Sequence, residues 1–288
     1  MRTRRARSLA VVVVMAISAI LLGAGKANPP TVNVYGDSLM TQSAGYFDSF
    51  TRTIAQGSDS AAPGSAPCDW RNEMEADSSA DRPSAVVLEF SGNAFTPCIA
   101  GAGRYETPAY FDQYKKDVST AVDEYVKVGT HVFIVGNAPT LAQVLSRDTR
   151  WNNLNWIYKA IAADHPGKAT FVNAGASVMS PEGEFTWTLP CAPIEPTCSA
   201  DGTNIVRASD GQHFCPKTPI SPAEWKICPV YSSGSFRYGL AIAESVNRFL
   251  ATGNAPAYEG PALDPNNIAP TVAPGQTDPY SAPSTSTE

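Results

Sequence analysis

The chain has 288 residues, of which 43% are hydrophobic and 17% charged, and its formal net charge is -6. This length can form one large α/β domain or two small ones, and the hydrophobic fraction is ample for a packed core. Outside the extreme N-terminus no cluster of Lys and Arg could track a phosphate backbone, so the composition argues against nucleic acid as a partner.

Residues 1–27 carry the three parts of a secretory signal. Arginines precede an apolar run over residues 9–22, and small residues follow up to Ala27. The apolar run is short for a bilayer span, which needs about 20 residues. We therefore expect cleavage close to Ala27, export to the cell envelope or the medium, and no stable membrane span in the mature protein.

The mature chain opens with a β-rich run over residues 31–35, followed directly by Gly36-Asp37-Ser38-Leu39. A serine that ends a first strand and opens the following helix has its hydroxyl at the carboxyl end of the strand. Its backbone N–H then lies at the positive end of the helix. Both features suit attack on a carbonyl group, so Ser38 is the candidate nucleophile.

Strand-like and helix-like stretches alternate through the rest of the domain. Short apolar runs that predict strands lie at 85–90, 131–135 and 170–172. Helical spacing of apolar residues predicts helices within 107–129, 151–161 and 236–249. This βαβα alternation predicts a parallel sheet covered by helices on both sides, and such sheets bind ligands beyond the carboxyl ends of their strands.

The cysteines form an even set in a chain expected to reach an oxidising space, where disulfides persist. The count alone does not pair them. Closing two short loops gives the pairs Cys191–Cys198, Cys215–Cys228 and, by remainder, Cys68–Cys98. A metal site is the alternative, but the chain has no Cys-x-x-Cys pair and no His-Glu-x-x-His signature. We therefore expect three structural disulfides and no metal or other cofactor.

Residues 180–233 break the alternation and are rich in Pro, Thr and Cys. We expect an ordered but irregular excursion whose disulfides hold Asp210 and His213 in place. From residue 253 the chain turns to Pro, Ser, Thr and Gly, with too little apolar surface to offset the entropy of ordering. The expected organisation is a signal peptide over 1–27, a catalytic domain over 28–252 and a disordered Pro-rich tail over 253–288.

A serine hydrolase with this sequence must draw its general base from three histidines. His131 begins an apolar strand and His165 lies in a turn that ends a helix, and both positions are typical of structural or solvated histidines. His213 follows Asp210 by three residues, so a carboxylate stands where it can orient the imidazole. Ser38, Asp210 and His213 are therefore the candidate catalytic residues.

Two sequence blocks resemble those of the SGNH, or GDSL, hydrolase superfamily, namely Gly36-Asp37-Ser38-Leu39 and Asp210-Gly211-Gln212-His213. Judged by the order of the blocks, the resemblance spans residues 31–250. It implies an α/β fold of three layers, α/β/α and flavodoxin-like, with a parallel central sheet and a Ser-His-Asp triad. It also implies an oxyanion hole formed by the serine N–H, a glycine N–H and an asparagine side chain.

The two remaining oxyanion donors come from the middle of the chain. Gly64 lies in a turn before an expected helix, where its N–H suits an anion, and Gly57 in a polar loop is the alternative. Asn93 follows the strand that ends at residue 90. The family block there reads Gly-x-Asn-Asp, whereas this chain has Ser91 in place of the glycine and Ala94 in place of the aspartate. These two replacements alter the local turn but keep the side-chain amide of Asn93.

The resemblance implies a secreted serine esterase or lipase that hydrolyses carboxylic esters of small molecules, lipids or glycans through an acyl-enzyme. A disulfide between Cys68 and Cys98 would then clamp the Gly64 and Asn93 loops, and with them two oxyanion donors.

Two alternatives stay open beside the esterase. One is a cell-envelope O-acyltransferase of the same fold, which would yield an acylated acceptor instead of free acid. The other is a catalytically inactive glycan-binding module that uses Trp70, Trp187 and Trp225. An α/β-hydrolase is disfavoured, because the nearest approach to its Gly-x-Ser-x-Gly motif, around Ser177, lacks the second glycine.

Overall fold

The computed structural model describes residues 28–100, 107–146, 151–216, 228–255 and 258. The expected signal peptide, most of the expected tail and Trp225 lie outside the described residues. The part of the chain that is described contains no helix long and apolar enough to cross a membrane.

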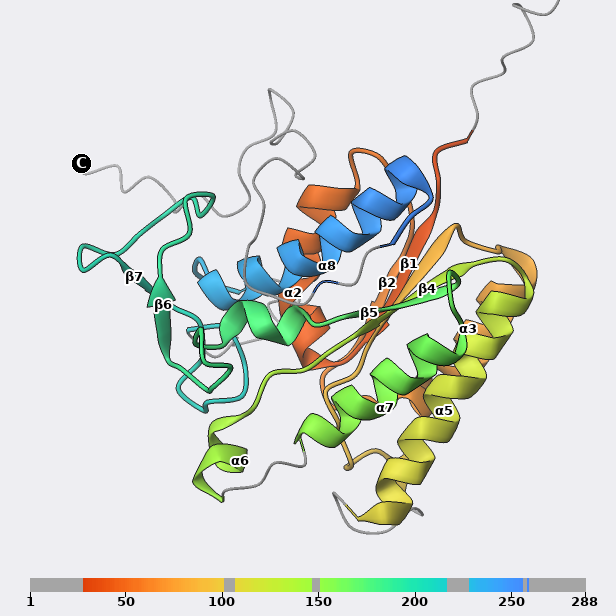
Figure 1. Ribbon diagram of the computed structural model, residues 1–288, viewed down its shortest axis with the longest axis horizontal. Helices are drawn as coiled ribbons and strands as arrows, with labels where there is room; N and C mark the ends of the chain where they lie inside the picture. The colour runs from red at the N-terminus through yellow and green to blue at the C-terminus, as the bar shows by residue number, and fades with distance from the viewer. Residues whose placement is uncertain (1–27, 101–106, 147–150, 217–227, 256–257, 259–288) are drawn as a thin grey trace, which may run out of the picture.

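A parallel sheet of five strands forms the centre of the fold (Figure 1). Its strand order is β2-β1-β3-β4-β5, which is the flavodoxin-like order, and every neighbouring pair runs parallel. The predicted α/β class with a parallel central sheet is therefore confirmed. The strands are β1 (Val32–Gly36), β2 (Asp59–Ala61), β3 (Ala85–Glu89), β4 (His131–Val135) and β5 (Ala169–Val172).

Helices cover both faces of the sheet and complete three layers (Figure 1). One face carries α2 (Ser38–Thr51) and α8 (Ser233–Thr252), and the other carries α3 (Arg71–Ala80), α5 (Pro108–Lys127) and α7 (Trp151–Asp164). Each face has its own hydrophobic core. The shorter helices are η1 (Pro67–Trp70), α4 (Pro97–Ala100), α6 (Leu141–Leu145) and η2 (Ala174–Val178).

Local sequence explains the regular elements well. Thr107 caps α5 by accepting a hydrogen bond from the backbone N–H of Tyr110, and Pro108 occupies the first turn, where its missing N–H costs nothing. Strands β1, β3, β4 and β5 are buried along their whole length, as expected for strands covered on both faces. Hydrophobic periodicity therefore places these elements correctly.

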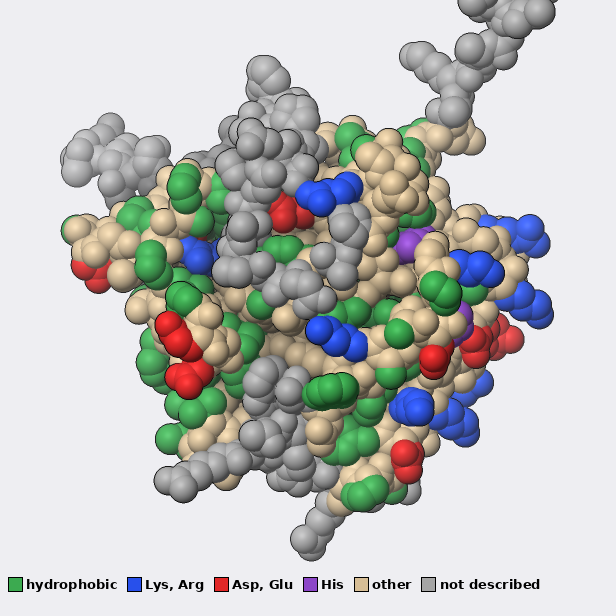
Figure 2. Space-filling view, in the orientation of Figure 1, with side chains coloured by type: hydrophobic (Ala, Val, Ile, Leu, Met, Phe, Trp, Pro, Cys, Tyr) green, Lys and Arg blue, Asp and Glu red, His purple; other side chains and the backbone are tan. Residues whose placement is uncertain are grey.

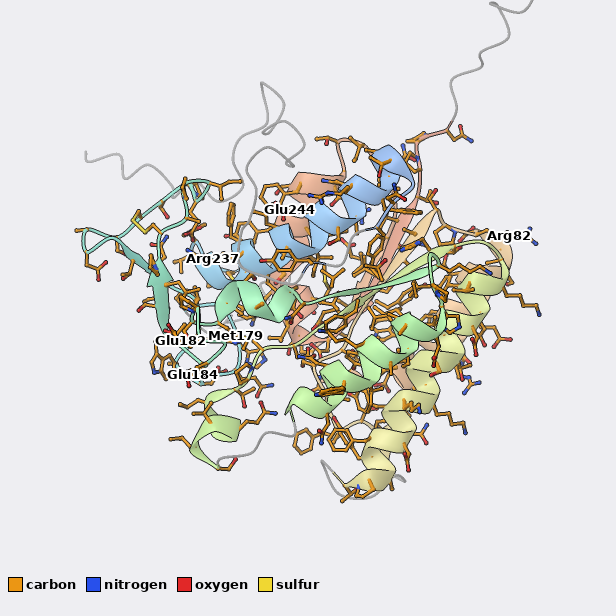
Figure 3. All side chains as sticks on the ribbon, in the orientation of Figure 1. Arg82, Met179, Glu182, Glu184, Arg237 and Glu244 are labelled. Carbon is orange, nitrogen blue, oxygen red and sulfur yellow. A yellow bond between two sulfur atoms is a disulfide. The ribbon has the colours of Figure 1, made fainter. Side chains whose placement is uncertain are left out.

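Two strand pairings lie outside what the pattern predicts. Strand β2 is short and polar, and it forms because Val34 to Gly36 of β1 offer it backbone partners at the sheet edge. The excursion over 180–233 is less irregular than predicted, since β6 (Thr188–Pro190) pairs antiparallel with β7 (Thr203–Ile205). Figure 3 shows Arg237 on the side of α8 that faces this pair, where it binds Glu195.

The three predicted disulfides are confirmed. They join Cys68 to Cys98, Cys191 to Cys198, and Cys215 to Cys228. Two of them brace the excursion over 180–233, and the first joins the segment after β2 to the segment after β3. Cross-links of this kind restrict segments that secondary structure alone does not hold.

Candidate active site

The structure brings Ser38, His213 and Asp210 into one hydrogen-bonded chain. The Ser38 Oγ lies 3.0 Å from the Nε2 of His213, although the two residues are 175 positions apart. The Nδ1 of His213 lies 2.7 Å from the Oδ2 of Asp210. Because a carboxylate only accepts hydrogen bonds, Nδ1 carries the imidazole proton and Nε2 is left as an acceptor for the Ser38 hydroxyl. This is the arrangement of a serine nucleophile with its base and an orienting carboxylate.

Ser38 owes its position to the turn between β1 and α2. Asp37 caps α2, with its Oδ1 accepting a hydrogen bond from the backbone N–H of Leu39. Gly36 must lack a side chain, because a Cβ there would lie 2.5 Å from the Cβ of Met40 and 2.9 Å from the carbonyl oxygen of Glu89. The turn therefore places the Ser38 hydroxyl at the carboxyl edge of the sheet and its N–H at the helix terminus.

The His213 loop is fixed by its own carboxylate and by α2. The Oδ1 of Asp210 accepts the backbone N–H groups of Gln212 and His213, so one carboxylate shapes the turn and orients the ring. These hydrogen bonds, above all the one from His213, hold the pKa of Asp210 below its usual range. Gln42 docks the loop from the other side, since its Oε1 accepts the backbone N–H groups of Phe214 and Cys215. Asp210 therefore stays ionised beside the base.

Arg207 lies beneath the same loop as a fully buried cation. Its guanidinium donates to the carbonyl oxygens of Gln212, at 3.2 Å, and Pro139, at 3.3 Å. It also lies over the rings of Phe185 and Phe214. Burial lowers the pKa of Arg207 to about 10, which leaves the side chain charged at neutral pH. Arg207 thus links the loop that carries the base to the loop that follows β4.

The backbone N–H groups around Ser38 and in the Gly64 loop differ in whether the protein supplies an acceptor for them. In the first turn of α2, the N–H groups of Leu39, Met40 and Thr41 all have acceptors within the protein. The described contacts give the N–H groups of Ser38 and Gly64 none. Gly64 follows β2 with a φ of 81°, a left-handed conformation that favours glycine.

Gly57, the alternative to Gly64, belongs to the opposite end of the sheet. It precedes β2, next to the amino end of β1, and a Cβ there would lie 1.7 Å from the carbonyl oxygen of Val32. Its role is therefore the close approach of two backbones. The Gly64 loop is instead tied to the carboxyl end of β1, because the Ser65 Oγ donates to the carbonyl oxygen of Gly36.

The amide of Asn93 already has two acceptors. Its Nδ2 donates to the Oδ2 of Asp37 at 2.9 Å and to the carbonyl oxygen of Ser65 at 3.2 Å. An amide nitrogen carries two hydrogens, so an oxyanion could be bound only in place of one of these acceptors. Ser91, which replaces the family's glycine, donates to the same Asp37 oxygen through its N–H and its hydroxyl. The altered block thus anchors this loop to the residue before the nucleophile.

Asp37 and Glu89 form a buried carboxyl pair below the nucleophile. Both are fully buried, and burial raises the pKa of each. The Asp37 carboxylate accepts hydrogen bonds from four donors, and the Glu89 carboxyl accepts from the Met40 N–H and the Tyr238 hydroxyl. Burial, and next the charge of Asp37, raise the pKa of Glu89 well above its usual value, so Asp37 is the better placed of the two to carry the charge.

The other two histidines lie outside this cluster. His131 is buried at the start of β4, where it stacks on Phe249, and burial lowers its pKa to about 4. His165 ends α7, with one ring nitrogen on the carbonyl oxygen of Ile161 and the other on the carboxylate of Asp123. Neither histidine contacts Ser38. His131 is a buried residue of β4 and His165 lies at the end of α7, in agreement with the predictions from the sequence.

A pocket of about 250 Å³ opens beside the triad. Leu39, Asn93 and Gln212 form the part of its wall nearest to Ser38 and His213, and Phe111 and Leu154 form part of the remainder. The described residues contain no group of three His, Cys, Asp or Glu side chains arranged to hold a metal ion. The groups that meet at this edge are the hydroxyl of Ser38, the imidazole of His213 and the carboxylate of Asp210.

Sequence reasoning missed several side chains that hold the site. Gln42 carried a weak signal, because it follows Ser38 by four residues and so shares its face of the helix. Asp37 sits in the motif and precedes a helix, which is the pattern of an N-cap. Glu89 and Arg207 gave no local signal, since each acts through contacts with distant segments.

Residues 31–218 match the family described as protein of unknown function DUF459, and the chain belongs to that family. None of the curated proteins matches the chain. The sheet order and the positions of the first and last blocks agree with the SGNH/GDSL-type fold recognised from the sequence.

Several solved structures are similar at low identity. A proposed acylhydrolase from Bacteroides fragilis is 16% identical, with 82% of this chain and 95% of that chain covered and a TM-score of 0.48. A lipase/acylhydrolase from Enterococcus faecalis is 16% identical over 54% of this chain and 85% of that one, with a TM-score of 0.39. A catalytic mutant of an acetylxylan esterase from Geobacillus stearothermophilus is 15% identical over 51% and 77%, with a TM-score of 0.40.

Proposed function

We propose that this protein is a serine ester hydrolase of the SGNH type that works through an acyl-enzyme. One observation carries the proposal: the Ser38 hydroxyl lies within hydrogen-bond distance of a histidine whose other nitrogen is held by a carboxylate. A serine hydroxyl is a weak nucleophile without such a base. Each of the three side chains therefore has a role in acyl transfer.

In the first half-reaction, the Ser38 Oγ attacks the ester carbonyl carbon while the Nε2 of His213 accepts the hydroxyl proton. The imidazolium is stabilised by Asp210, whose carboxylate remains ionised. His213 then returns the proton to the alcohol oxygen as the carbon–oxygen bond breaks. In the second half-reaction, water attacks the acyl carbon and gives a proton to His213. His213 then passes that proton to the Ser38 Oγ as the bond between this oxygen and the acyl carbon breaks, and the free acid is released.

The negative charge that develops on the carbonyl oxygen requires fixed donors. The N–H groups of Ser38 and Gly64 meet this need without reorganisation, and Ser38 adds the positive end of the α2 dipole. Asn93 would contribute by exchanging the Ser65 carbonyl oxygen, its longer hydrogen bond, for the oxyanion. Its bond to Asp37 holds the amide in place during that exchange.

We also propose that the enzyme acts outside the cytoplasm, after removal of residues 1–27. The disulfides support this location, because such bonds persist in oxidising compartments. Of the tryptophans named for the glycan-binding alternative, Trp187 is 40% exposed, whereas Trp70 is held within the protein. Trp70 packs on Tyr35 and donates its indole N–H to Ser65, so it belongs to the Gly64 loop.

The test is labelling with a fluorophosphonate probe, followed by assay on p-nitrophenyl acetate. The wild-type protein should be labelled once and should release p-nitrophenol, and Ser38→Ala and His213→Ala should lose both signals. Ser177→Ala is the matched control, because Ser177 is buried in the rival Gly-x-Ser motif and donates to the carbonyl oxygen of Ala174. Labelling that survives in Ser38→Ala would refute the proposal. Release of free acid, and not of an acylated acceptor, separates hydrolase from transferase.

A further inference from the structure

The pocket beside the triad is lined without any charged side chain among its described residues. Its apolar walls come from five segments, namely the start of α2, the loop after β3, the first turn of α5, the loop after β4, and α7. These segments contribute, in that order, Leu39, Phe95, Phe111, Ala138 and Leu154. A site of this composition favours an uncharged and largely apolar group.

Most of the polar groups in the pocket wall already have partners in the protein. Ser91 and Asn93 donate to Asp37. Thr140 and Gln143 form a reciprocal capping box at the start of α6, in which each side-chain oxygen accepts the other residue's backbone N–H. Within the described part of the chain, the side-chain amide of Gln212, the Nε2 of Gln143 and the buried Oδ1 of Asn137 are left without a partner. The wall thus offers few hydrogen bonds to a polyhydroxylated group.

Apolar side chains continue from the pocket onto the surface. Phe95, in the pocket wall, is 91% exposed, and Leu145 and Val144 of α6 are 75% and 46% exposed. None of the residues of α6 is buried. Figure 2 shows hydrophobic side chains over α6, and Figure 3 places the acidic side chains of Glu182 and Glu184 beside that region. We call Phe95, Val144 and Leu145 the apolar rim.

We propose that the pocket and the apolar rim together bind an aliphatic chain of the ester substrate. The inference rests on the proposed function and names its substrate class. The pocket, at about 250 Å³, is smaller than most ligand sites, so it takes only the first part of a chain. The remainder of the aliphatic chain lies along the apolar rim, whose large side chains would otherwise be exposed to water.

An aliphatic chain explains two features that a sugar would not. A sugar ring needs several hydrogen-bond donors and acceptors, whereas most of those in the pocket wall already form hydrogen bonds within the protein. A sugar also gains little from Leu145 and Val144, whose surfaces offer no hydrogen bonds. Each methylene that leaves water strengthens binding about 4-fold, so binding along the rim would increase with chain length.

The test compares esters of graded chain length. One arm varies the acyl group with a fixed leaving group, using p-nitrophenyl acetate, butanoate and octanoate. The other varies the alcohol with a fixed acyl group, using ethyl, butyl and octyl acetate. In one arm the wild-type kcat/KM should rise with chain length, and that arm identifies the side of the ester that enters the pocket.

The rim is tested with Phe95→Ala and Leu145→Gln, alone and combined. The combined variant should lower about 10-fold the ratio of kcat/KM for the longest ester to kcat/KM for the shortest ester, in the arm that responds to chain length. Ile205→Gln is the matched control, since Ile205 is 51% exposed on β7, away from the pocket. It should leave both rates unchanged.

The outcomes separate the two proposals. Turnover that is flat or falls with chain length in both arms overturns the chain site and leaves the esterase intact. A loss of acetate turnover equal to the loss of octanoate turnover in the rim variants also overturns it. Absence of turnover on every ester, together with absence of fluorophosphonate labelling, overturns the proposed function and this inference with it.

Discussion

Replacing Glu89 with glutamine should remove a pH-dependent loss of stability. In the folded protein Glu89 is fully buried beside Asp37, and burial raises its pKa well above the usual value. In the unfolded chain the same carboxyl ionises near pH 4.5. Above that pH the folded state retains a proton that the unfolded state releases, so the wild type loses stability as pH rises toward the folded pKa.

The magnitude follows from the number of protons involved. One proton held only by the folded state lowers the free energy of unfolding by about 1.4 kcal/mol for each pH unit. Between the pKa of the unfolded state and the raised pKa of the folded state, the Glu89→Gln variant should therefore gain stability relative to the wild type by up to that amount for each pH unit.

Glutamine fits the contacts that Glu89 makes. Its Oε1 can accept the N–H of Met40, as the Glu89 Oε2 does at 3.1 Å. Its Nε2 can donate to the Tyr238 hydroxyl, because that hydroxyl has a second acceptor in the carbonyl oxygen of Gly136 at 3.4 Å. The substitution therefore removes the ionisable group and keeps the hydrogen bonds.

The assay is urea unfolding at several pH values, with the disulfides intact. The difference in the free energy of unfolding between Glu89→Gln and the wild type should grow steadily as pH rises. Glu73→Gln is the control, because Glu73 is exposed on α3 and its curve should run parallel to the wild type. Parallel curves for Glu89→Gln and the wild type would show that the buried pair holds no proton.

Three further predictions concern the supports of the site. Gln42→Leu should lower the melting temperature and turnover together, because it leaves two buried backbone N–H groups without an acceptor, each costing about 1–3 kcal/mol; an unchanged melting temperature would contradict this. Arg207→Met should reduce kcat about 10-fold or more while fluorophosphonate still labels the protein slowly, since the loop of His213 loses a charged donor. An unchanged turnover in Arg207→Met would show that the Arg207 guanidinium does not position His213. Replacing Cys68 and Cys98 together with serine should lower turnover more than it lowers the melting temperature, and simultaneous loss of fold and activity would refute a clamping role.

Local pattern was sufficient for the main layers of the fold. Strands β1, β3, β4 and β5 read as short apolar runs because a parallel sheet covered on both faces buries every residue of its inner strands. The α5 helix follows from its cap and its spacing of tyrosines and valines. Strand β2 could not be read in this way, because an edge strand of three residues has no periodicity of its own.

Ser38, Asp210 and His213 could also be predicted from the sequence. The chain has three histidines, and His213 alone follows an aspartate at a spacing that allows one carboxylate to cap the turn and bind the ring. That spacing is local, so it leaves a trace in the sequence. The short loops closed by two of the disulfides leave a trace for the same reason.

Tertiary structure alone decided how these groups meet and what surrounds them. The contact between Ser38 and His213 spans 175 positions, and it exists because Gln42 of α2 binds the backbone of the loop that carries His213. The two acceptors of Asn93, the burial of Glu89 beside Asp37 and the apolar rim have no local pattern, since each depends on segments that only the fold makes adjacent. The sequence determined which chemical groups this protein has, and the packing of distant segments decided which of them act together.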